Sequence, residues 1–172
     1  MEYTPQNIMR QHNNWKDITD VGGTDTINDI YIRDPNTSTF WYVGKVSRCT
    51  GTVSVEQAVQ RQWHLIEQHA ARLRQNELRS KYGSLEIWVA PGNTELDVAY
   101  NRPNIKFTRV QRPSAQEEVE TLRKSIKNAE VGFQGDVYER DEEGFRTERT
   151  DDGLPAKPEI TGLQNEQKVE TQ

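Results

Sequence analysis

The chain contains few of the residues from which metal centres and nucleophilic active sites are built. Its 172 residues include one cysteine, Cys49, and three histidines. A single cysteine excludes an internal disulfide and an all-cysteine metal cage, and it suits a reducing compartment. His64 and His69 are five positions apart, whereas two ligands on one helix face need a spacing of three or four. We therefore expect no metal site and no cofactor.

Long hydrophobic runs are also missing. Hydrophobic residues make up 33% of the chain, and no apolar run approaches the roughly 18 residues that a membrane-spanning helix needs. The first residues lack the basic and apolar regions of an export signal. We expect a soluble cytoplasmic protein, for which peripheral association with a membrane complex stays open.

The last third of the chain carries an excess of negative charge. Residues 1–115 carry 14 basic and 12 acidic residues, whereas residues 116–172 carry 8 and 15, so net charges of +2 and −7 give the total of −5. A nearly neutral body with an acidic extension argues against nucleic-acid binding, which requires a clustered basic face. Such an extension is more typical of a solubilising or partner-docking segment.

Residues 54–73 contain the clearest helical pattern. Ser54 and Gln57 have the spacing of a capping box. Six apolar residues follow at spacings of three and four and form one continuous stripe, made of Val55, Val59, Trp63, Ile66, Ala70 and Leu73. The other faces carry charged residues such as Arg61 and Glu67. The pattern predicts one long amphipathic helix whose apolar face is buried against a sheet.

Alternating apolar residues on either side of this helix predict the strands. The alternation occurs at residues 27–33, 40–46, 85–89, 96–100 and 105–107, with turn residues between them. Because a helix joins Val46 to Leu85, we expect those two strands to be parallel and the others antiparallel. The sequence therefore predicts an α+β fold, with a single mixed, mostly antiparallel sheet and one long amphipathic helix packed across it.

The chain is predicted to have four parts. Residues 1–24 form an N-terminal segment with a short helix that Thr4 caps, and residues 25–112 form the α+β core. Residues 113–150 begin with a charged insertion, either an exposed helix or a mobile segment, and end in a hairpin made by residues 131–139 and 144–150. Residues 151–172 contain two prolines and few apolar residues, so we expect a disordered tail.

Trp41 and Trp88 are the first candidates for a partner surface. Alternation along the second strand predicts two sets on opposite faces, Phe40, Tyr42, Gly44 and Val46 on one and Trp41, Val43 and Lys45 on the other. We expect Trp41 and Trp88 to lie on the same face, which the helix leaves uncovered. Each indole is then either packed under the C-terminal hairpin or exposed to a partner, because aromatic residues concentrate at interface hot spots.

Two loose groups of basic residues are further candidates. One surrounds the last predicted strand of the core, and the other, made of Arg72, Arg74, Arg79 and Lys81, follows the helix. Either group could contact an acidic protein or a phosphate, and solvated surface charge is the simpler interpretation. Neither group has the interleaved aromatic residues of an RNA-binding surface. The predicted partner-binding residues are Trp41, Trp88, Arg102, Lys106 and Arg109.

No catalytic group is predicted. Cys49 precedes the helix, where the pKa of a thiol can be lowered, but no histidine lies beside it in the sequence. Glu95 and Asp97 share one predicted strand face, and with Glu86 on the neighbouring strand they could form an acid/base pair. A solvent-facing hairpin explains these carboxylates more simply. We therefore favour a non-enzymatic protein.

Several stretches resemble a family of small proteins from cyanobacteria and chloroplasts. They are Phe40–Val46 with the helix stripe that follows, Leu85–Ala99, and Gly132–Gly135. The resemblance implies an accessory subunit or assembly factor of a photosynthetic complex on the cytoplasmic face of the thylakoid membrane, with the NAD(P)H dehydrogenase-like complex as one candidate. It implies no catalytic residues, and it favours a partner as the cover of the second sheet face. The alternative is a small-molecule-binding protein or enzyme that uses that open face.

Overall fold

The described residues form one sheet with helices on both sides. A computed structural model of the chain describes residues 2–138 and 143–161. Its strands lie in the order β4-β3-β1-β2-β5, and β6 also pairs with β2. Each of these pairs is antiparallel, which confirms the α+β fold with a mostly antiparallel sheet. β2 and β3 run in the same direction, as predicted, but β1 lies between them.

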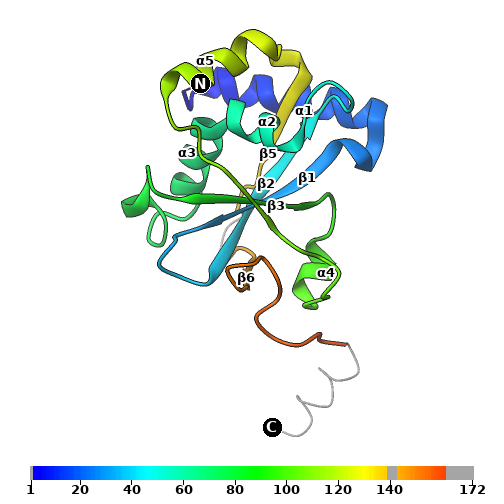
Figure 1. The fold of residues 1–172 in the computed structure, drawn as a ribbon, viewed down its shortest axis with the longest axis vertical. Coiled ribbons are helices and arrows are strands. Elements are labelled where there is room, and N and C mark those ends of the chain that lie inside the picture. The colour runs from blue at the N-terminus through cyan, green and yellow to red at the C-terminus, as the bar shows by residue number, and fades with distance from the viewer. Residues whose placement is uncertain (1, 139–142, 162–172) are drawn as a thin grey trace, which may run out of the picture.

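Helices and strands are interspersed along the chain (Figure 1), and the described residues also contain three short 3₁₀ turns. Their order is α1 (Pro5–Gly22), β1 (Ile27–Arg33), β2 (Thr39–Arg48), α2 (Val55–Arg61), α3 (Trp63–Leu73), β3 (Glu86–Pro91), α4 (Glu95–Ala99), β4 (Thr108–Val110), α5 (Gln116–Ser125), β5 (Val131–Gly135) and β6 (Arg146–Glu148). The capping of α1 by Thr4 is confirmed, because the Thr4 side chain accepts a hydrogen bond from the Asn7 amide.

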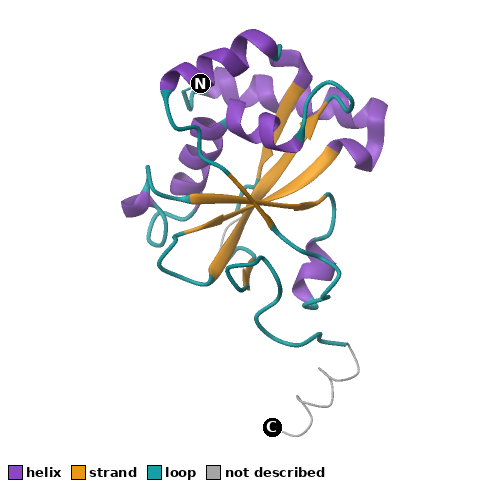
Figure 2. Cartoon of the chain, viewed as in Figure 1, coloured by secondary structure: helices purple, strands orange, loops and turns teal. Residues whose placement is uncertain are grey.

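The larger core lies between the sheet and helices α1, α2 and α3. The predicted stripe points into it, and Val59, Trp63, Ile66 and Ala70 are at most 2% exposed. They pack against Ile30, Ile32, Val43 and Ile87 of the sheet. Figure 2 shows four of the five helices gathered on this side, with α4 alone on the other.

The predicted long helix is interrupted at Gln62, where the backbone has φ −110° and ψ 16°. The Gln62 amide donates to the Val59 carbonyl at 3.1 Å, while its side-chain Nε2 donates to the Ala58 carbonyl at 3.0 Å. Because the side chain takes over the acceptor of the regular helical bond, the turn tightens and the helix restarts at Trp63. The capping box of Ser54 and Gln57 is confirmed.

A β-bulge in β2 corrects the predicted alternation of its side chains. Two residues, Val43 and Gly44, lie where the regular ladder would place one, and the register with β1 shifts between Ile30 and Tyr31. Gly44 has φ +150°, and an added Cβ would lie 2.3 Å from the Gln134 carbonyl oxygen, so a side chain does not fit there. After the bulge the faces exchange, so Val46 joins the helix-covered core.

The segment after β3 differs most from the prediction. Residues 96–100, expected as a strand, belong mainly to helix α4, and the last strand of the core begins at Thr108 rather than at Ile105. The Asp29 carboxylate accepts hydrogen bonds from the amides of Asn93 and Thr94 at 3.0 Å. These bonds satisfy backbone amides at the start of α4. A side chain from the neighbouring strand thus takes the place of a local helix cap.

The C-terminal third contains an ordered helix and no two-stranded hairpin within the described residues. Helix α5 is formed, and Val119 is its only buried residue, so the segment is a mostly exposed helix rather than a mobile insertion. Strands β5 and β6 pair with different halves of β2 instead of with each other. The predicted turn includes Asp141 and Glu142, which lie outside the described residues.

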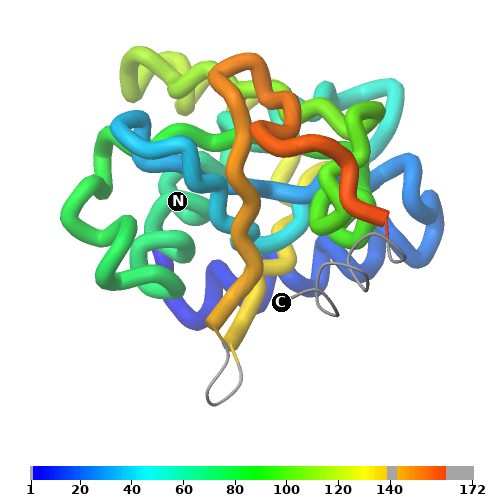
Figure 3. The backbone as a smooth tube through the Cα atoms, turned by 90° about the horizontal axis from the view of Figure 1, so that it is seen from below, coloured from blue at the N-terminus to red at the C-terminus, as the bar shows by residue number. Residues whose placement is uncertain are grey.

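Residues 143–161 cross the second face of the sheet (Figure 3). The Gly153 carbonyl accepts a hydrogen bond from the Phe107 amide at 2.9 Å, and the Ile160 amide donates to the Tyr100 carbonyl at 2.7 Å. The prediction of a disordered tail from Asp151 is therefore wrong for residues 151–161, because backbone hydrogen bonds hold them. Residues 162–172 lie outside the described part of the chain.

Candidate functional site

The two candidate tryptophans lie on opposite faces of the sheet, so the expected shared face is wrong. Trp41 lies opposite Ile32 and Trp88 lies opposite Tyr31. Because Tyr31 and Ile32 are adjacent in β1, their cross-strand partners point in opposite directions. Trp41 is 5% exposed and Trp88 is 4% exposed. Both are core residues, and neither forms an exposed aromatic patch in the isolated chain.

The second face, for which the sequence left either the C-terminal hairpin or a partner as the cover, is covered by the chain itself. Its buried residues form a separate cluster of Tyr31, Phe40, Trp88, Ala90, Val98, Ile105 and Phe107. Arg149 closes this cluster, with its guanidinium 3.9 Å from the centre of the Phe107 ring. Its Nη1 donates to the carbonyls of Ile105 and Gly153 at 2.8 and 2.9 Å. Burial lowers the pKa of Arg149 to about 10, so it stays charged at neutral pH.

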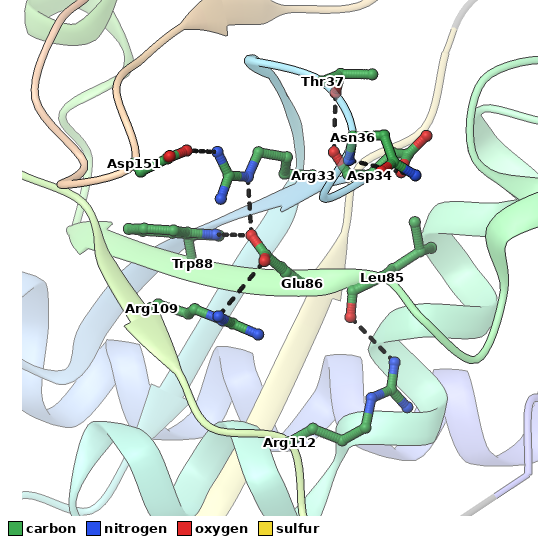
Figure 4. A network of polar contacts seen from close by, with 10 residues as sticks. All are labelled: Arg33, Asp34, Asn36, Thr37, Leu85, Glu86, Trp88, Arg109, Arg112 and Asp151. Carbon is green, nitrogen blue, oxygen red and sulfur yellow. Dashed lines mark hydrogen bonds and ion pairs between the residues drawn. The ribbon is translucent and has the colours of Figure 1, made fainter.

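Trp88 belongs to a polar network centred on Glu86 (Figure 4). Arg33 Nε donates to Glu86 Oε1 at 2.8 Å, and Trp88 Nε1 donates to the same oxygen at 3.0 Å. Arg33 Nη1 donates to Asp151 at 2.7 Å. The Arg33 and Glu86 side chains are each 7% exposed. The network ties β1, β3 and the C-terminal segment together, and its burial marks it as a structural ion pair.

A second buried ion pair corrects the predicted polar face of the helix. Glu67, expected in solvent, is 0% exposed, and Arg112 Nη2 donates to its Oε2 at 2.7 Å. Arg112 also donates to the Leu85 carbonyl (Figure 4). Arg61, likewise expected in solvent, is 6% exposed and donates to the Ile126 carbonyl. Glu67 thus links α3 to the segment after β4, and Arg61 links α2 to the residue that follows α5.

The predicted carboxylate pair is replaced by a different cluster. Lys45 Nζ lies 2.9 Å from Asp29 and 2.7 Å from Glu95. Burial and the hydrogen bond with Glu95 together raise the pKa of the Asp29 carboxyl to about 6. Asp29 and Lys45 are cross-strand partners in the β1–β2 hairpin, so the pair could have been predicted from the sequence if the register of the hairpin had been assigned. Because Asp29 also holds the amides before α4, the cluster supports that turn.

The other predicted chemical groups stay apart. Glu86 belongs to the Arg33 network, and Asp97 Oδ1 lies 3.1 Å from Arg102 Nε. Cys49 is half-buried, and its amide donates to the Glu130 carbonyl. Among the described residues, no group of three His, Cys, Asp or Glu side chains could hold a metal ion.

Lys106 and Arg109 border a groove at the open edge of the sheet. The groove has a volume of about 440 Å³. Its lining residues come from β1, β3, β4 and the start of α2, and the apolar ones are Val55, Val89, Ala90, Pro91 and Val110. Arg102 does not line this edge groove, and it pairs with Asp97 and Glu159. The structure therefore unites two of the five predicted partner residues at one surface.

Comparisons of this chain with known protein families, with characterised proteins and with solved structures give no match. The resemblance seen in the sequence therefore gains no support from them. None of the described helices is long and apolar enough to cross a membrane. The edge groove is thus the starting point for a functional interpretation.

Proposed function

We propose that this protein is a non-enzymatic accessory subunit or assembly factor, which binds a larger protein complex through the edge groove. One observation supports the proposal most. An apolar groove lies beside the terminal strand β4, and two exposed cations, Lys106 and Arg109, border it together with one exposed carboxylate, Glu56. Lys106 has no ion pair among the described residues, and Arg109 is 52% exposed with Glu86 at 3.5 Å.

The chemistry of the edge groove favours an extended, acidic segment as its occupant. β4 is the last strand of the sheet, and no further strand pairs with it within the described chain. A peptide can add to such an edge as another strand, with main-chain hydrogen bonds for affinity and side-chain pockets for specificity. Apolar side chains of that peptide would enter between Val55 and Val110, while its carboxylates would meet Lys106 and Arg109.

A photosynthetic complex is the proposed partner. The support is the resemblance of residues 39–150 to small proteins of cyanobacteria and chloroplasts. The NAD(P)H dehydrogenase-like complex is one candidate, and peripheral attachment to the cytoplasmic face of the thylakoid membrane would follow from it. The alternative of a ligand site on an open sheet face loses its basis, because the second face is covered.

Charge reversal at the edge groove tests the proposal. A Lys106→Glu/Arg109→Gln variant should lose capture of a stoichiometric complex from a thylakoid extract while its circular dichroism spectrum stays that of the folded protein, because Arg109→Gln places no second carboxylate beside Glu86. The control is Arg10→Glu/Lys16→Glu, which reverses two exposed charges on α1 and should retain capture. Equal loss in both variants, or no loss in the first, would contradict docking at this groove.

A further inference from the structure

A second cavity lies at the end of α3, away from the edge groove. Its volume is about 460 Å³, and its lining residues are Gln68, Ala71, Arg72, Gln75, Arg79 and Tyr82. This volume lies within the range of pockets that hold small organic ligands. The lining contains residues of the second basic group noted in the sequence, which the proposed docking does not use.

Hydrogen bonds fix one wall of this cavity. Gln68 Oε1 accepts from the Tyr3 amide at 2.9 Å, and Gln68 Nε2 donates to the Tyr82 hydroxyl at 3.2 Å. The Arg72 guanidinium lies 4.5 Å from the centre of the Tyr3 ring, which holds it by cation–π attraction. The N-terminal segment and the turn after α3 are thereby tied to the same glutamine, so the wall is formed before a ligand binds.

The polar groups of the cavity are mostly donors. Arg72 and Arg79 both line it, no carboxylate does, and neither arginine has an ion pair among the described residues. The Tyr82 hydroxyl accepts from Gln68, so its own proton is free to donate. Two guanidiniums at one cavity repel each other, and an anion with several acceptor oxygens removes that repulsion.

We propose that this cavity binds a small organic phosphate that carries a planar ring, such as a nucleoside diphosphate. The forks of Arg72 and Arg79 match phosphate oxygens, which arginine binds in a bidentate manner. Tyr82, 44% exposed, offers a ring face on which a base can stack. A simple inorganic ion would leave this aromatic wall unused.

Binding at this cavity would change the pKa of His69, which contacts the N-terminal segment through Tyr3. The Tyr3 hydroxyl lies 2.8 Å from His69 Nδ1, and the other ring nitrogen lies 2.7 Å from the Asp136 carbonyl oxygen. Burial lowers the pKa of His69, the bond to Asp136 opposes this, and the charge of Arg72 lowers the pKa further. An anion on Arg72 would cancel the last contribution, so the pKa of His69 would rise.

Calorimetric titration of the full chain with ADP, pyrophosphate and adenosine tests the proposal. ADP and pyrophosphate should bind and adenosine should not. Arg72→Gln/Arg79→Gln should weaken ADP binding by about tenfold or more, the loss expected for charge-assisted hydrogen bonds. Tyr82→Leu should bind ADP about fivefold more weakly than Tyr82→Phe, whereas the two variants should bind pyrophosphate equally, because both lose the hydroxyl and only Tyr82→Leu loses the ring contact.

The control is Arg10→Gln, which removes one exposed charge outside the cavity and should leave ADP binding unchanged. NMR titration of the imidazole of His69 should show a higher pKa in the presence of ADP. The proposal is overturned if ADP does not bind at low salt, or if Arg10→Gln weakens it as much as the cavity variant. Binding of a polyglutamate peptide in place of ADP would also overturn it, because the cavity would then serve an acidic protein.

Discussion

The two faces of the sheet are covered in different ways. On one face, a local and regular element supplies the cover, since α2 and α3 follow β2 directly and place Val59, Trp63 and Ile66 in the core. On the other face, the cover comes from residues 92–107, which contain the short helix α4, and from residues 143–161, which contain β6. Charged groups such as Glu86 and Arg149 take part there.

This difference matters for function. An uncovered face would have offered Trp88 to a partner, whereas the observed cover leaves the sheet edge and surface cavities as the places for binding. Arg33, Glu86 and Asp151 join three segments distant in sequence, so the second face depends on interactions that act only in the folded chain. We expect the helical face to respond to lost apolar volume and the second face to respond to lost charge.

The largest effect is expected on the helical face. Trp63→Ala removes an indole that is 2% exposed and should lower the free energy of unfolding by about 4 kcal/mol, the usual cost of such a cavity. Urea denaturation measures this loss. Trp15→Ala, at a half-buried position of α1, is the comparison and should cost less. A loss below that of Trp15→Ala would contradict the assignment of Trp63 to the core.

Glu86→Gln should have the next largest effect, through charge on the second face. It leaves Arg33 buried without its main partner, and breaking a buried pair costs roughly 3 kcal/mol. Glu77→Gln is the matched control, because Glu77 pairs with Arg74 at a side-chain exposure of 38%, and its loss should be within about 1 kcal/mol. Equal effects of the two variants would show that the Glu86 network is not a structural element.

Removal of residues 151–172 should be less costly. The deletion removes the Asp151 partner of Arg33 and the Gly153 acceptor of the Phe107 amide. Together these contacts should contribute about 2 kcal/mol, as hydrogen bonds of this kind do. Thermal unfolding measures the change, and deletion of residues 162–172 alone separates the two segments. An unchanged melting temperature for the longer deletion would contradict this account and would agree with the disordered tail that the sequence predicts.

The sequence predicted the helical face because its information is local. The capping box at Ser54 and the apolar stripe each lie within a few turns of chain, and both are confirmed. The hairpin of β1 and β2 was found for the same reason. The sequence also identified Lys106 and Arg109, which border the edge groove. It did not predict the groove itself, because the other lining residues come from elements distant in sequence.

Contacts between residues distant in the sequence were not predictable in the same way. Residues 96–100 alternate like a strand, but Asp29 of another strand holds the turn before them and a helix follows. The burial of Glu67 depends on Arg112, 45 positions later. The bulge at Gly44 exchanges the side-chain faces of β2, and the local residue pattern does not predict this shift of register.

The smallest expected effect is a pH dependence on the second face. Burial and the hydrogen bond with Glu95 raise the pKa of Asp29 from its usual 3.8 to about 6. The folded protein therefore binds this proton more tightly than the unfolded chain, and Asp29 makes the free energy of unfolding fall as pH rises from 3.8 to about 6. We expect a change on the order of 1 kcal/mol, because the exposed Glu95 limits the coupling.

Urea denaturation of the wild type and Asp29→Asn at several pH values between 4.5 and 6 isolates this contribution. Burial lowers the pKa of both His64 and His69, which adds stability as pH rises, and this opposite slope cancels in the difference between the two proteins. The free energy of unfolding of the wild type minus that of Asp29→Asn should fall as pH rises toward 6. A constant difference would mean that Asp29 does not titrate in this range.

Hydrogen exchange of the backbone amides, measured with and without the captured complex, tests most directly where the partner docks. Edge docking predicts slower exchange at residues 108–110 of β4, because a peptide added to the edge gives these amides new acceptors and excludes water. Exchange in α1, on the helical side, should stay unchanged. Slower exchange in α1 or α5 with no change at β4 would contradict docking through the edge groove.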